Sequence, residues 1–263
     1  MLNIQRRKAT VLLATAFIVG AAVIPLQRYP AMQAPPAAQP PVAGTEARYE
    51  YHAIHDPNGT GRFYLGREIA AVMGPGGLAW LDRPERETEE RPDVVVDAIG
   101  LQRGALVADL GAGSGYFTFR LAAKVGKRGR VLAVDLQDEM LATIRQRAAA
   151  LHVSNVEEVT GTETDPHLPA GAVDVVLMVD VYHELAYPFE VMAHVREALK
   201  PGGRVVFVEY RKEDPSIPIK EVHKMSVQQL EKEMNAVGLV HLRTVESLPS
   251  QHIVVFGKPV VGG

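Results

Sequence analysis

The residues best suited to chemistry lie in the segment Val107–Tyr116, which reads V-A-D-L-G-A-G-S-G-Y. An apolar strand pattern leads into Asp109, three glycines follow at alternate positions, and a helical pattern begins after them. Glycine adopts positive φ angles and lets the backbone approach a ligand closely, and open α/β sheets bind small molecules at the carboxyl ends of their strands. The segment is therefore interpreted as a ligand-binding turn.

The spacing of the glycines excludes three kinds of site. A dinucleotide fingerprint needs a glycine where Tyr116 stands, a P-loop needs a Gly-Lys-Ser/Thr sequence that does not follow, and a serine nucleophile elbow needs glycines two positions to either side of Ser114. Asp135 ends the next apolar run, where a carboxylate can accept both hydroxyls of a ribose. Asp109 adds negative charge that disfavours a pyrophosphate, so a cationic ligand with a ribose is expected.

A mostly parallel sheet must bring these residues together. From about Leu106 onward, short apolar runs alternate with helical patterns, which predicts an α/β, Rossmann-like fold with helices on both faces of the sheet. Strands are expected at residues 106–110, 130–134, 155–159 (an edge strand), 173–179 and 204–209, and helices at 117–125, 138–151 and 188–199, the last stopped by residues 201–203.

The C-terminal part predicts one more helix and a hairpin. Ser226 and Gln229 form a capping box that opens a helix, and Gly238 closes it. Residues 239–245 and 252–257 are joined by a turn too short for a crossover helix, so they must pair antiparallel. The expected sheet is therefore seven-stranded and mostly parallel, with a C-terminal antiparallel hairpin.

The N-terminal part divides into three segments. Arg6, Arg7 and Lys8 precede an uncharged, mostly apolar run up to residue 26, which is typical of a signal peptide or a membrane anchor, and a Pro/Ala-rich linker follows over residues 27–44. The positive-inside rule then favours an exported or membrane-anchored, periplasmic or other extracytoplasmic domain, with a cytoplasmic location left open. Residues 45–100 are expected to form a helical cap before the domain at 101–263, and the charged run at 83–91 a solvated helix face.

The composition limits the function further. The chain of 263 residues has no cysteine, which excludes disulfides, thiolate nucleophiles and zinc–thiolate sites. The net charge of -3 makes nucleic acid an unexpected partner. His52, His55 and Asp56 have metal-like spacing, but loops commonly carry such residues and no fourth ligand is evident, so no metal site is predicted.

The segment Asp109–Gly115 resembles the first motif of class I S-adenosylmethionine-dependent methyltransferases. Coverage is about residues 100–257, and the terminal antiparallel hairpin is this family's departure from the dinucleotide-binding sheet. The resemblance implies an enzyme that uses S-adenosyl-L-methionine to methylate a small-molecule, lipid or protein acceptor. The later motifs fall at Asp135, at 161–169, at 179–183 and at 199–204.

The resemblance also implies roles for particular residues. Asp135 would hold the ribose hydroxyls, and Asp109 would lie near the methionine ammonium. Apart from the resemblance, an acceptor that must lose a proton needs a general base, and His183 with its neighbours Tyr182 and Glu184 is the expected candidate. The family usually has an aspartate where Thr162 stands, so the family's usual contact to the adenine amino group is not predicted from this position. The residues expected to contact the cofactor are Asp109, Gly111, Ala112, Gly113, Gly115, Tyr116, Asp135, Leu136, Thr162, Glu163 and Asp180.

Relatives that methylate amino groups of nucleic-acid bases carry an Asn/Asp-Pro-Pro-aromatic run after the fourth strand, and the run Asp180–Tyr182 has neither proline. Two alternative functions stay open from the sequence. The domain could bind S-adenosylmethionine without catalysis. It could also be a nicotinamide-dependent oxidoreductase, but Tyr116 in place of a third glycine and the terminal hairpin argue against this alternative.

Overall fold

A computed structural model describes residues 48–259. The expected signal or anchor and most of the linker, up to residue 47, lie outside the described residues, and their role stays a prediction. Within residues 48–259, none of the helices combines the length and the apolar character required to span a bilayer.

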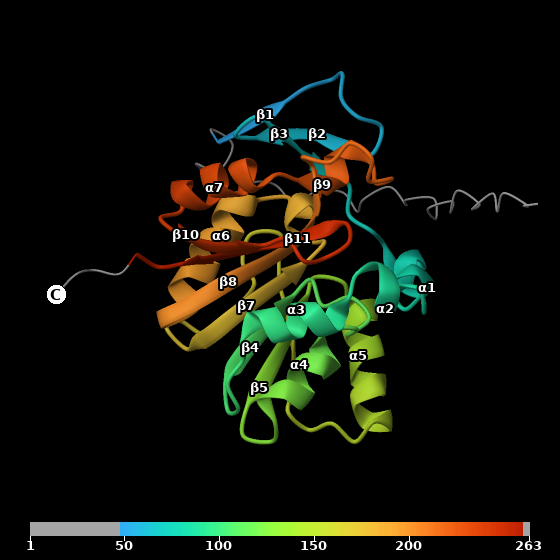
Figure 1. Ribbon diagram of the computed structural model, residues 1–263, viewed down its shortest axis with the longest axis vertical. Helices are drawn as coiled ribbons and strands as arrows, with labels where there is room; N and C mark the ends of the chain where they lie inside the picture. Colours follow the sequence, from blue (N-terminus) through green and yellow to red (C-terminus); the bar gives the residue numbers. More distant parts are fainter. Residues whose placement is uncertain (1–47, 260–263) are drawn as a thin grey trace, which may run out of the picture. The chain divides into compact units, whose positions relative to one another are not determined.

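The main sheet has the predicted topology. Its strands lie in the order β10-β11-β8-β7-β4-β5-β6, and the five from β8 to β6 run parallel while β10 and β11 pair antiparallel at the other end (Figure 1). β6 is at the edge, as expected, and the short β9 adds an eighth strand beside β8. The strands are β4 (Leu106–Leu110), β5 (Arg130–Asp135), β6 (Val156–Thr160), β7 (Val173–Val179), β8 (Leu199–Arg211), β9 (Lys224–Met225), β10 (Val240–Val245) and β11 (Gln251–Gly257).

Both faces of the central strands are buried, because successive side chains point to opposite faces. Val176 and Met178 of β7 belong to one apolar cluster with residues of α6 and α7, while Val175 and Leu177 belong to another with residues of α3 and α4. The helices are α3 (Pro92–Ile99), α4 (Thr118–Val125), α5 (Asp138–Ala150), α6 (Pro188–Ala198) and α7 (Val227–Ala236).

Two predicted helix boundaries differ in detail. α6 ends at Ala198 as expected, but residues 201–203 lie within β8, because a bulge opposite β7 accommodates them between the paired positions Leu199 and Arg204. At the start of α7 the Ser226 hydroxyl accepts a hydrogen bond from the Gln229 backbone N–H (3.1 Å), which is half of the predicted capping box. The Gln229 amide instead donates to Leu65 and Glu233.

The expectation of a helical cap over residues 45–100 is wrong for its first part. Residues 49–70 form an antiparallel three-stranded sheet of β1 (Tyr49–Tyr51), β2 (Gly59–Tyr64) and β3 (Arg67–Ala70). Leu65 and Gly66 join β2 to β3 with φ angles of 49° and 86°. The helical part follows as η2 (Pro75–Gly77), α1 (Leu78–Leu81), α2 (Arg86–Glu89) and α3.

A buried ion pair fastens the small sheet to the main domain. The Arg67 guanidinium in β3 donates to both carboxylate oxygens of Glu233 in α7, at 2.8 and 3.0 Å, and to the backbone carbonyl of His183 at 3.1 Å. Glu233 also accepts from the Tyr182 hydroxyl at 2.6 Å. Both charged groups are buried, so each depends on the other for compensation.

Glu233→Ala is expected to lower the free energy of unfolding by about 3–5 kcal/mol, because it leaves the Arg67 charge buried without its partner. Urea denaturation of the purified protein measures this loss. Glu157→Ala is the matched control, since Glu157 pairs with Arg130 on the surface (2.9 Å), and its expected cost is below about 1 kcal/mol. Equal losses in the two variants would contradict the role assigned to the buried pair.

Candidate cofactor and acceptor site

The glycine turn joins β4 to α4 and is fixed to the end of β5. Gly111, Gly113 and Gly115 have φ angles of 74°, 53° and 82°, which side chains of other residues rarely tolerate. The Gly111 and Ala112 backbone N–H groups donate to the Val134 carbonyl, at 2.8 and 3.0 Å. The predicted strand, turn and helix are therefore present, with the turn beside the last residue of β5.

Asp135 has the geometry expected of a group that binds ribose hydroxyls. One carboxylate oxygen accepts from the Gly113 N–H at 2.9 Å and the other from the Gln137 N–H at 3.0 Å. Each oxygen keeps further acceptor capacity, so the carboxylate can also accept from two hydroxyls. Burial raises its pKa, while these backbone bonds act in the opposite direction. Leu136 next to it is 45% exposed, which offers an apolar surface to an adenine ring.

Asp109 contributes a buried negative charge behind the turn. Its carboxylate accepts a hydrogen bond from the Thr118 hydroxyl at 2.6 Å, and the residue is 4% exposed. Burial raises its pKa to about 6, so the group is ionised at neutral pH at a cost that a nearby cation would relieve. These residues fit a cationic adenosine derivative and disfavour a pyrophosphate.

The segment between β3 and α3 covers the glycine turn. Asp82 accepts from the Ser114 hydroxyl at 2.8 Å and pairs with Arg147 of α5. A Leu81 methyl carbon lies 3.0 Å from where a Cβ on Gly113 would stand. The Met73 carbonyl accepts from the Gln137 side chain at 3.1 Å, and the Met73 N–H donates to Glu184 at 3.4 Å. This segment, residues 72–90, is called the cover below.

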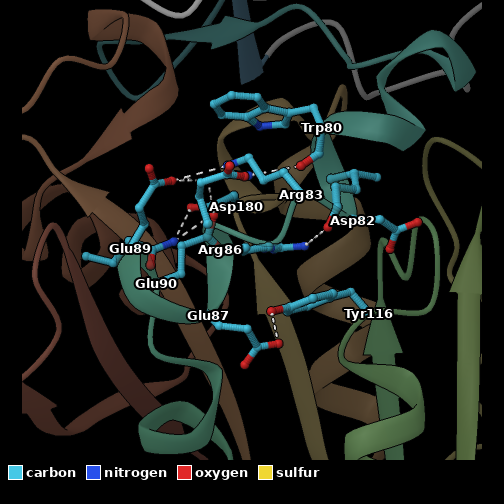
Figure 2. Close-up of polar contacts among 12 residues, drawn as sticks. Trp80, Asp82, Arg83, Arg86, Glu87, Glu89, Glu90, Tyr116 and Asp180 are labelled. Atoms are coloured by element: carbon cyan, nitrogen blue, oxygen red, sulfur yellow. Dashed lines mark hydrogen bonds and ion pairs between the residues drawn. The ribbon is translucent and has the colours of Figure 1, made fainter. Parts of the chain in front are cut away.

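The cover is stabilised by an internal ion network (Figure 2). Arg83 donates to Glu89 at 2.9 Å and to Glu90 at 2.7 Å, and Arg86 donates to Glu90 at 2.5 Å. Arg83, Arg86 and Glu90 are buried while Glu85, Glu87, Glu89 and Arg91 are exposed, so the interpretation of this run as a solvated helix face is wrong only for the three buried residues. The charges of Arg83, Arg86 and Glu90 instead neutralise one another inside the cover.

Three predicted cofactor residues have other contacts. The Tyr116 hydroxyl donates to Glu87 of the cover at 2.6 Å (Figure 2). The Thr162 hydroxyl accepts from the Asp165 N–H at 2.9 Å within a local turn, and the half-buried Glu163 follows it. The turn itself lies beside Asp135, because the Gly161 N–H donates to the Asp135 carbonyl at 3.0 Å.

The end of β7 carries a second group of ionisable residues. Asp180 has a φ of 53°, and both of its carboxylate oxygens accept from the Gln251 amide, at 2.9 and 2.7 Å. Burial, Glu90 and Glu209 raise its pKa. His183 is 2% exposed, and its Nδ1 shares a 2.5 Å hydrogen bond with Glu209 in β8. Its Nε2 lies 3.1 Å from Nδ1 of His223.

The structure corrects the expectation that Tyr182 is catalytic. Its side chain is fully buried, its ring packs against Phe207, and its hydroxyl donates to Glu233. The turn η3 (Tyr182–Glu184) directs Tyr182 toward α7 and its neighbour His183 toward His223. Tyr182 therefore stabilises the attachment of α7 and does not face an acceptor.

Sequence reasoning missed several residues of this region. Glu209 is a lone carboxylate at the end of the apolar run V-V-F-V-E, a signal that was available. Glu184 was noted only as a neighbour of His183. His223 lies in no recognisable motif, and His183 and His223 are 40 residues apart. Only the packing of η4 (Glu221–His223) beside η3 brings these side chains together.

A seven-stranded α/β sheet with a terminal antiparallel hairpin, a glycine turn and an acid at the end of the next strand defines the class I S-adenosylmethionine-dependent methyltransferases. Residues 108–205 match the family described as "Methyltransferase domain". The chain therefore contains a methyltransferase domain of this class, and the cofactor of the class is S-adenosyl-L-methionine.

Known structures and relatives agree with this assignment. An S-adenosylmethionine-dependent methyltransferase from Aquifex aeolicus superposes with a TM-score of 0.66 at 26% identity, over 70% of this chain and 98% of that one. A putative type 11 methyltransferase from Sulfolobus solfataricus shares the fold, with a TM-score of 0.56 at 19% identity, over 66% of this chain and 96% of that one.

Among curated relatives, the ubiquinone/menaquinone biosynthesis C-methyltransferase UbiE of Enterobacter sp. (strain 638) is 30% identical over 44% of this chain and 47% of its own length. An uncharacterized protein in transposon TN4556 of Streptomyces fradiae is 32% identical over 55% of this chain and 41% of its own. The chain thus spans less than half the length of these relatives.

Asp109→Asn is expected to raise the free energy of unfolding at pH 7.5, by up to about 3 kcal/mol. With its pKa raised from 3.8 to about 6, the folded protein keeps a proton that the unfolded chain releases. The stability from this group is complete below about pH 4 and is lost as the pH rises through about 6. The difference between variant and wild type should therefore shrink toward zero near pH 4.

Thermal and urea unfolding from pH 4 to 8 measure this difference. Asp97→Asn is the control, because Asp97 is exposed and pairs with Lys124 on the surface, so its effect should stay below about 1 kcal/mol at every pH. An Asp109→Asn variant less stable than the wild type at pH 7.5 would show that the buried charge carries no such cost.

Proposed function

We propose that this protein transfers the methyl group of S-adenosylmethionine to a small-molecule, lipid or protein acceptor. The observation that carries the proposal is the Asp135 carboxylate, held by the Gly113 and Gln137 N–H groups beside the glycine turn. A group fixed in this way is preorganised to accept ribose hydroxyls without reorganising.

When bound, S-adenosylmethionine supplies a methyl group already activated on a sulfonium, so the protein has mainly to orient and to exclude water. Asp135 fixes the ribose, and Asp109 balances the positive charge of the methionine part. Leu136 presents an apolar surface to the adenine. The cover excludes water, because Leu81 and Asp82 pack directly on the glycine turn.

The acceptor is proposed to lie on the β7 side of the cofactor. Asp180, Glu184 and Glu209 surround this region with carboxylates, which favours a neutral or cationic acceptor over a phosphate-rich one. The net charge of -3 supports the same choice. His183 is the remaining predicted catalytic residue; Glu209 engages its Nδ1, and its Nε2 faces His223 Nδ1 at 3.1 Å.

Asp135→Asn is expected to weaken S-adenosylmethionine binding about 10- to 100-fold, because charge-assisted hydrogen bonds to the ribose contribute roughly 1.5–3 kcal/mol. Isothermal titration calorimetry measures the dissociation constant, with unfolding curves to show that the variant is folded. Glu157→Gln, an exposed carboxylate, should bind like the wild type. Unchanged binding in Asp135→Asn would refute the cofactor site.

The reaction itself is tested with methyl-labelled S-adenosylmethionine added to a lysate with the purified protein. Label should accumulate in the small-molecule, lipid or protein fraction, and Asp135→Asn should abolish it at cofactor concentrations near the wild-type dissociation constant. Binding of the cofactor without transfer to any fraction would indicate a sensing module in place of an enzyme.

A further inference from the structure

We infer that His183, Glu184 and His223 form a binding site for a divalent first-row transition metal, of which zinc is the best match. One ligand atom from each residue faces the other two, and all lie within 4.8 Å of one another. Two imidazoles and one carboxylate are the ligand set that such metals prefer in a protein without cysteine. The sequence predicted no metal site, because these ligands form no linear motif.

The distances fit a metal at the centre of the cluster. His183 Nε2 lies 3.1 Å from His223 Nδ1 and 3.9 Å from a Glu184 oxygen, and the third side of the triangle is 3.6 Å. Tetrahedral zinc with bonds of ~2.0–2.1 Å places its ligand atoms about 3.3–3.4 Å apart. Shifts of a few tenths of an ångström would therefore complete the coordination, and the fourth position stays open for water or a substrate.

Groups behind the ligands hold them in place. The buried Glu209 shares the 2.5 Å hydrogen bond with His183 Nδ1, and it also accepts from the Tyr182 N–H at 2.9 Å. A carboxylate on the far nitrogen of a metal-binding histidine fixes the ring and its tautomer. Glu184 is oriented by the Met73 N–H of the cover. The cluster is thus a preorganised arrangement and not a chance meeting of surface side chains.

The local charge also favours a cation. Glu184, Glu209 and Asp180 converge on this region, while the buried Arg67 is committed to its bidentate pair with Glu233. A divalent ion would be held by the Glu184 carboxylate together with the two imidazoles, and would stabilise the ionised form of that carboxylate. Since a nitrogen bound to a metal cannot take up a proton, this assignment replaces the expected general-base role of His183.

Metal binding is tested on the full chain, purified without a histidine tag and dialysed against EDTA. Titration calorimetry with zinc chloride should show one ion per chain, and cobalt(II) should give the visible absorption bands of a four-coordinate site with nitrogen ligands. Zinc at about 100 times the dissociation constant should raise Tm by about 5–10 °C.

His223→Ala and Glu184→Gln are expected to weaken zinc binding at least 100-fold and to abolish the cobalt bands. Both side chains are partly exposed, so the folded state should survive, and Tm without metal checks this. His194→Ala is the matched control, because His194 lies near Asp165 at the surface, and it should bind zinc like the wild type. Absent binding, or binding that both variants retain, would overturn the site.

A role for the metal in holding the acceptor rests on the proposed function. EDTA should then lower the rate of methyl transfer at least 10-fold without changing the dissociation constant of S-adenosylmethionine. Added zinc should restore the rate. The two claims fail separately, because zinc titration needs no cofactor and cofactor titration needs no zinc. Transfer that proceeds undiminished in EDTA would overturn the acceptor role.

Discussion

Four carboxylates at one edge of the sheet, three of them buried and Asp180 half-buried, are the constraint on which the site depends. Asp109 lies in β4, Asp135 ends β5, Asp180 follows β7 and Glu209 lies near the end of β8. These strands are neighbours in the order β8-β7-β4-β5, so parallel topology alone gathers the acids. Burial raises the pKa of all four, to about 6 for Asp109 and about 8 for Glu209, because their charged forms are costly without a nearby cation. Cationic ligands are the natural way to relieve this cost.

The cover and the small sheet add arginines at this edge of the sheet, and each arginine is paired with a glutamate. The cover brings Arg83 and Arg86, but Arg83 donates to Glu89 and Glu90, and Arg86 donates to Glu90. The small sheet brings Arg67, whose guanidinium is neutralised by Glu233 in the same way. Desolvated ion pairs of this kind contribute packing and attachment while adding little net field. Burial raises the pKa of Asp109 and of Glu209 by more than Arg86 and Arg67 lower it, so the charged forms of these carboxylates stay costly.

The sequence predicted what depends on local pattern and missed what depends on packing. Alternating burial on two faces gave β7 at its observed bounds, and the glycine turn with Asp135 was recognisable because its residues are near in sequence. The small sheet was missed because Leu65–Gly66 lacks the Asn-Gly or Asp-Gly signature of a hairpin with two positive φ angles. Tyr182 was misassigned because a single tight turn sends adjacent side chains to different partners.

Two cationic ligands at one sheet edge would repel each other unless acids lay around and between them. In the proposed arrangement, Asp109 and Asp135 lie on the cofactor side, on β4 and β5. Glu184 and Glu209 lie on the side of the inferred metal, at β7 and β8, and Asp180 lies between the two sides in strand order. Met73 touches both sides, since its carbonyl accepts from Gln137 and its N–H donates to Glu184. Recognition of a ribose explains only Asp135, whereas two cations explain why the edge holds so many acids.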